Sequence, residues 1–119
     1  MSPDSDQKHE GYMEIFKIVL DSQKAMLGDK VALKYIRKAP LEVDLNGEIG
    51  DYYGKGEDVL DIIVGQYEKV WGEDVADRKI GRKLKEELDE DKWDLLTEDL
   101  RNVEEKKGFI TQLKESILG

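Results

Sequence analysis

The stretch from Glu57 to Leu88 constrains the fold of this chain more than any other part of the sequence. Apolar residues are so dense from Val59 to Trp71 that a helix there is apolar over more than half of its circumference. Such a helix lies in the interior and contacts neighbours on more than one side. Gly72 ends the pattern, and a narrower amphipathic helix follows. Its apolar positions are Ala76, Ile80, Leu84 and Leu88. We therefore predict a central helical hairpin over residues 57–88.

Two further helices are predicted ahead of this hairpin. Residues 1–10 are almost entirely polar and are expected to form a mobile tail. Apolar residues at helical spacing then predict a helix from Gly11 to Leu27, and Gly28 stops it. A short helix from Lys30 to Lys38 should follow, with Asp29 as its N-cap and Pro40 preventing its continuation.

Residues 41–53 have the alternating pattern of a β-hairpin, and Asn46-Gly47 supplies the turn. A two-residue loop would place an apolar side chain opposite a charged one. A three-residue loop from Leu45 to Gly47 places Val43 opposite Ile49 and keeps one face apolar, so we favour that register. An isolated hairpin is marginally stable, so it must lie against the helices or pair with another copy.

Thr97 begins another predicted helix, which ends near Gly108, and residues 109–118 keep helical spacing of apolar side chains. The predicted fold is therefore mostly α with one small β-hairpin. Five to six short helices surround the central helical hairpin, and residues 11–119 form a single α-rich domain.

The composition narrows the classes of function. The chain has no cysteine, which excludes disulfides, thiolate metal sites and cysteine nucleophiles. The net charge is −9, and residues 41–77 hold two Lys/Arg against eleven Asp/Glu, which makes the middle of the chain acidic. An acidic patch repels nucleic acid and anionic lipid and suits a basic partner, although solubility alone also explains it. With no membrane-spanning run and no signal peptide, we expect a cytoplasmic protein.

No residue argues for an enzyme. The single histidine, His9, lies in the expected tail, so no histidine-based triad or metal cluster is available. Residues 42–53 begin like a calcium loop, but Tyr53 replaces the bidentate glutamate at the twelfth position. The glycines around Lys55 lack the spacing of a phosphate-binding loop, and acids follow them. We therefore expect no cofactor and no metal.

A basic face is predicted on the second helix of the central hairpin. Its residues are Arg78, Lys79, Arg82, Lys83 and Lys85. A nucleic-acid-binding regulator would use Arg78, Arg82 and Lys85 from this face. The competing interpretation is a solvated face, because Glu86 and Glu87 lie one turn from Arg82 and Lys83 and can pair with them.

An acidic stretch with one tryptophan forms a second candidate site, at helical spacing on one side. Its residues are Trp93, Leu96, Leu100 and Val103. Such a stretch can dock on a protein partner, whereas the simpler interpretation is that Trp93 covers the core of its own chain.

These features favour a non-catalytic, regulatory protein-interaction module that self-associates. We expect a homodimer whose interface uses the segment from Trp93 to Leu118, with the acidic run Glu86–Asp91 against the basic face of the other copy. The alternative is that this segment folds back over its own chain. The other function classes are the nucleic-acid-binding transcriptional regulator and a small-ligand sensor with a pocket lined by Tyr35, Tyr67 and Trp71.

Overall fold

The computed structural model describes residues 3–101, with the side chains of residues 8–97, 100 and 101. Helices dominate this part of the chain, which also holds one antiparallel two-stranded hairpin. In chain order the elements are α1 (Pro3–Leu27), α2 (Asp29–Ile36), β1 (Leu41–Val43), β2 (Ile49–Tyr52), α3 (Gly56–Trp71), α4 (Glu73–Glu87), the 3-10 helix η1 (Glu90–Leu95) and α5 (Glu98–Arg101). The predicted fold class, mostly α with one small hairpin, is confirmed.

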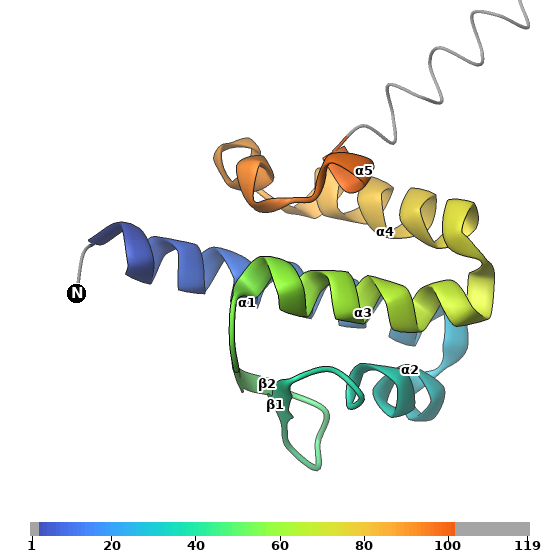
Figure 1. Cartoon of the computed structure of the whole chain (residues 1–119). Helices are drawn as coiled ribbons and strands as arrows, with labels where there is room; N and C mark the ends of the chain where they lie inside the picture. Colours follow the sequence, from blue (N-terminus) through green and yellow to red (C-terminus); the bar gives the residue numbers. More distant parts are fainter. Residues whose placement is uncertain (1–2, 102–119) are drawn as a thin grey trace, which may run out of the picture.

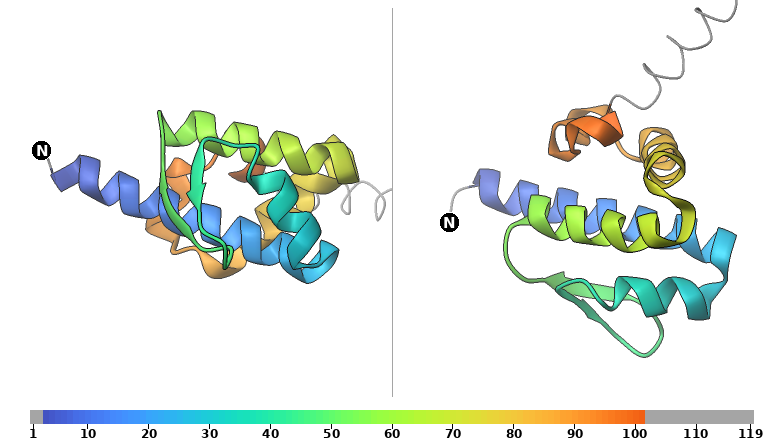
Figure 2. Two further views of the ribbon diagram at one scale, coloured as in Figure 1. Left: turned by 90° about the horizontal axis from the view of Figure 1, so that it is seen from below. Right: turned by 45° about the vertical axis from the view of Figure 1, so that its right-hand side comes forward.

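The elements form three layers, with α1 and α3 side by side in the middle (Figure 1). α2 and the β-hairpin cover one side of this middle layer, and α4, η1 and α5 cover the other (Figure 2). α1 contacts α2, α3, α4, β2 and η1, so it takes part in both interfaces between layers. The predicted helical hairpin is present as α3 and α4, which pack against each other around Gly72.

α1 is longer than predicted, because it begins at Pro3 instead of near Gly11. Proline is well tolerated in the first turn of a helix, where its missing N–H is not needed. The last of the added turns contacts the hairpin: the ring of His9 stacks on Tyr52 with centroids 4.8 Å apart, and His9 Nε2 is 3.3 Å from a carboxylate oxygen of Asp51. The mobility expected for residues 1–10 remains a prediction.

α2 is anchored to α3 by a buried tyrosine. The hydroxyl of Tyr67, which is fully buried, donates a hydrogen bond of 2.9 Å to the backbone carbonyl of Ala32. The start of α2 differs from the prediction, since Gly28 occupies the N-cap with φ of 87° and Asp29 is already the first helical residue. No side chain caps this end, and the helix stops at Ile36, two residues before the predicted end.

Next to the turn, the register of the β-hairpin agrees with the three-residue loop, whereas a bulge between Glu42 and Val43 shifts the pairing of the remaining strand residues. Val43 pairs with Ile49, and the backbone N–H groups of Gly47 and Glu48 bond to the carbonyl and the carboxylate of Asp44, respectively. Gly47 has φ of 85°, a conformation that other residues rarely adopt. Ile49 is buried against the helices, so the hairpin is stabilised by its own chain.

α3 buries one broad face, as predicted, although its apolar coverage is narrower than the sequence indicated. The buried residues are Gly56, Val59, Leu60, Ile63, Val64 and Tyr67. Ile62 points outward and is 40% exposed. Within residues 3–101, no helix is both long enough and apolar enough to cross a membrane.

Two glycines of α3 should respond in opposite ways to alanine. A Cβ at Gly56 would collide with the ring of Tyr12, whereas a Cβ at Gly65 has no neighbour within 4 Å. Gly56→Ala should therefore lower the free energy of unfolding by about 1–3 kcal/mol. Gly65→Ala should raise it by about 0.5–1 kcal/mol, because alanine is the better helix former. Urea denaturation of the two variants measures both changes in the free energy of unfolding. Equal changes would contradict the packing of α1 against α3.

The buried hydroxyl of Tyr67 predicts a pH dependence. Burial raises the pKa of Tyr67 above the usual value of about 10, because it disfavours the phenolate. This contribution to stability is complete below pH 10 and is lost as the pH rises further, when the unfolded chain ionises and the folded chain does not. Tyr67→Phe should cost about 0.5–1.5 kcal/mol at pH 7, and its stability should fall less steeply above pH 10.

Denaturation of wild type, Tyr67→Phe and Tyr53→Phe at pH 7 to 11 tests this account. Tyr53 is 60% exposed, so its variant should follow the wild-type profile. Parallel profiles for all three proteins would contradict the buried hydrogen bond.

Candidate functional site

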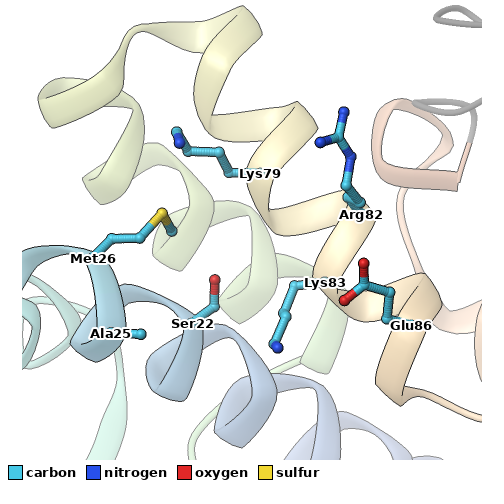
Figure 3. A pocket seen from close by; sticks show the side chains of 7 residues that line it. All are labelled: Ser22, Ala25, Met26, Lys79, Arg82, Lys83 and Glu86. Atoms are coloured by element: carbon cyan, nitrogen blue, oxygen red, sulfur yellow. The ribbon is translucent and has the colours of Figure 1, made fainter.

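A shallow groove of about 260 Å³ runs between α1 and α4 (Figure 3). α1 supplies its floor from the last two turns, and α4 supplies a wall of long charged side chains. The lining residues are Ser22, Ala25, Met26, Lys79, Arg82, Lys83 and Glu86. This groove lies on the basic face that the sequence predicts, but the α1 residues of its floor were not predicted as part of a site.

The floor combines an apolar side chain with a hydroxyl. Met26 is 37% exposed and borders the groove. Ser22 is only 6% exposed, and its side chain points toward the groove (Figure 3). Among the described residues, its hydroxyl has no hydrogen-bond partner. The hydroxyl is therefore available to a polar group that enters the groove.

The cations of the wall are not equivalent. Lys83 forms an ion pair of 3.3 Å with Glu87, which confirms part of the predicted self-pairing. Lys79 lies over the ring of Trp71, 5.1 Å from its centroid, so its charge also has a partner. Arg82 is exposed, and within the described residues no ion pair joins it to Glu86 one turn away. That predicted pair is absent, and both charges remain open to solvent.

The residues of the nucleic-acid alternative lie on one exposed face but differ in surroundings. Arg78 is exposed, and its Nε lies 3.4 Å from the carbonyl of Asp74 in the preceding turn. Lys85 is half-buried, with its ammonium 5.6 Å from the ring centroid of Trp93. Arg82 is thus the residue of this set whose charged group has the fewest neighbours.

The predicted docking residues do not lie along one helix. Trp93 is in η1, and Leu96 follows that helix in extended conformation before α5 begins. Leu96 and Leu100 are 3% and 1% exposed and belong to the core of the described chain. Val103 lies outside the described residues. Of the three that the structure describes, Trp93 is the one that is partly exposed, and its indole N–H donates to the carbonyl of Leu88 at 3.1 Å.

η1 is held on α1 by an ion pair that the sequence did not indicate. Lys92 Nζ contacts a carboxylate oxygen of Glu14, and the hydrogen bond between them raises the pKa of Lys92. The two residues are far apart in the chain, so only the tertiary fold brings them together. This contact fixes the turn that follows the acidic end of α4.

The aromatic residues of the sensor hypothesis are used in packing. Tyr67 is fully buried and lies next to Tyr35, with ring centroids 6.2 Å apart. The indole N–H of Trp71 donates to the side-chain oxygen of Gln23 at 2.8 Å. The groove between α1 and α4 and two hollows beside the β-hairpin are lined by other residues.

Among residues 3–101, no group of three or more His, Asp or Glu side chains could hold a metal ion. The carboxylate of Asp44, a ligand in the rejected calcium pattern, accepts the N–H of Glu48 and shapes the turn. His9 contacts Asp51 and Tyr52. Sequence reasoning missed that contact because it placed His9 in a tail.

Comparisons of the chain with known protein families, with curated proteins and with solved structures yield no match. The groove between α1 and α4 is therefore the feature from which a function has to be argued.

Proposed function

We propose that this protein is a non-catalytic, regulatory protein-interaction module that self-associates as a homodimer. The observation that carries the proposal is the α1–α4 groove, which offers an exposed methionine, an unpartnered hydroxyl and an unpaired guanidinium on one surface. Apolar contact beside charged groups is typical of protein interfaces, in which arginine and methionine are enriched. The surface of one protein partner can contact the methionine, the hydroxyl and the guanidinium at the same time.

The chemistry of the groove favours an acidic partner surface. Arg82 presents a planar guanidinium that can bind a carboxylate through two parallel hydrogen bonds. Lys79 and Lys83 add positive charge beside it. Glu86 on the same wall opposes binding of a polyanion such as nucleic acid, since phosphates along a duplex would meet it.

Self-association is tested by the mass of the particle in solution. Light scattering at tens of micromolar should give twice the chain mass of 13.7 kDa. A chain that ends at Lys107 should also give twice its own, smaller chain mass, because the groove lies wholly within the described residues. A monomeric mass for the intact protein removes the proposal. Loss of dimer in the shortened chain alone would return the interface to residues 108–119.

A titration with duplex DNA separates this proposal from the nucleic-acid regulator. Anisotropy measured at about 150 mM salt should show no saturable binding, since the acids Glu86 and Glu87 follow the cations of α4 and would repel a duplex that lies along the helix. Specific binding that weakens steeply with salt, and that is lost in Arg78→Ala/Arg82→Ala, would establish the regulator in place of the protein-interaction module.

A further inference from the structure

The outer face of α4 and the residues that follow it carry opposite charges in two halves. Lys79, Arg82 and Glu86 are exposed residues of this helix that border the groove beside α1 (Figure 3), and Arg78 is also exposed. The basic half comprises Arg78, Lys79 and Arg82. The acidic half comprises Glu86, Asp89 and Glu90, all exposed. The core positions of α4 lie on the opposite side, so within the described residues this face packs only at its margin, where Lys79 lies over the ring of Trp71.

Most of these charges are not neutralised by other residues within the part of the chain that the structure describes. Among the described residues, Arg82, Glu86 and Glu90 take part in no ion pair, and Asp89 approaches only Lys92 at 3.9 Å. Arg78 contacts a backbone carbonyl, and Lys79 contacts an aromatic ring. The two halves of the face are therefore complementary to each other, although one copy cannot fold back to join them.

We infer that two copies of the chain pair through this face, with their α4 helices antiparallel about a two-fold axis between Arg82 and Glu86. In one register, Arg82 then meets Glu86 of the second copy. Symmetry forms this pair twice. Asp89 and Glu90 lie beyond the end of α4, after the extended Leu88, and add negative charge at the end that meets the basic half of the second copy. An isologous arrangement of this kind closes as a dimer and leaves no half of the face unpaired.

The groove adds a hydrogen-bond donor and apolar area to this charged interface. Glu86 of the second copy would reach the rim of the groove beside Arg82, where the hydroxyl of Ser22 can donate to its carboxylate. Met26 and the exposed Ala25 lie next to this point and provide apolar area that the second helix covers. The register thus uses the features of the groove that have no function within one chain.

This inference rests on the proposed self-association and moves its interface from the C-terminal segment to α4. Two observations support the move. Leu96 and Leu100, which were expected to meet a second copy, are buried in their own chain. The acidic run, expected to face the basic surface of the other copy, is exposed at the end of α4. The predicted charge pairing is kept, and only the apolar part of the interface changes.

Charge reversal tests the register. Arg82→Glu and Glu86→Arg should each raise the dissociation constant of the dimer at least about tenfold, because each places like charges opposite one another at two symmetric points. Lys69→Glu and Asp58→Lys are matched controls on the exposed side of α3 and should leave the constant unchanged. Sedimentation equilibrium gives the constants, and circular dichroism verifies that all four variants keep the helical fold.

Mixing the two reversed variants gives the sharper result. In a heterodimer, the glutamate introduced by Arg82→Glu meets the arginine introduced by Glu86→Arg, and the second contact keeps the native pair. The mixture should therefore recover dimer with near wild-type affinity, although each variant alone is largely monomeric. Arg82→Glu that dimerises like wild type would overturn the α4 interface and leave self-association standing. A wild-type protein that is monomeric would overturn both.

Discussion

The fold depends on α1, which takes part in both interfaces between layers. Its buried residues are Ile15, Phe16, Ile18, Val19, Leu20, Ser22 and Gln23. The amide of Gln23 is fully buried and accepts the indole N–H of Trp71, which ties the end of α1 to the end of α3. A buried polar group is costly unless it is bonded, so the bond to the Gln23 oxygen favours one alignment of the two helices, whereas the Nε2 of the same amide has no partner among the described residues. The layers on either side can then form only on an intact α1.

In α4, the residues that stabilise the fold and the residues proposed to bind a partner lie on opposite sides of the helix. The apolar side of α4 packs on α1 and α3, which leaves its charged side without any part in the core. The C-terminal elements have a different role, because Leu96 and Leu100 complete the core and Lys92 ties η1 to α1. The surplus of apolar side chains that suggested a dimer interface is thus, as far as the described residues reach, used within the chain. The face of α4 and the groove beside it are thus open to a partner.

The sequence predicted those helices and strands whose periodicity of apolar residues can be seen within one short segment. α3 and α4 follow helical periodicity on either side of Gly72, and the alternation around Asn46-Gly47 predicted the register of the hairpin. The first turns of α1 were missed because residues 3–10 have no apolar period, and the contact that anchors them involves the distant Tyr52. The candidate site was likewise predicted only in part, because some of its residues come together through tertiary contacts. Arg82 was recognised on a basic face, whereas Ser22 and Met26 join it only because α1 and α4 pack together.

Native-state hydrogen exchange tests the central role of α1 most directly. The amides of residues 15–23 should exchange only through global unfolding, because opening α1 disrupts both outer layers. Amides of α2, the hairpin and η1 should also exchange through smaller, local openings of lower free energy. An α1 that exchanges faster than α2 or α4 would show that the layers fold without it and would contradict this account.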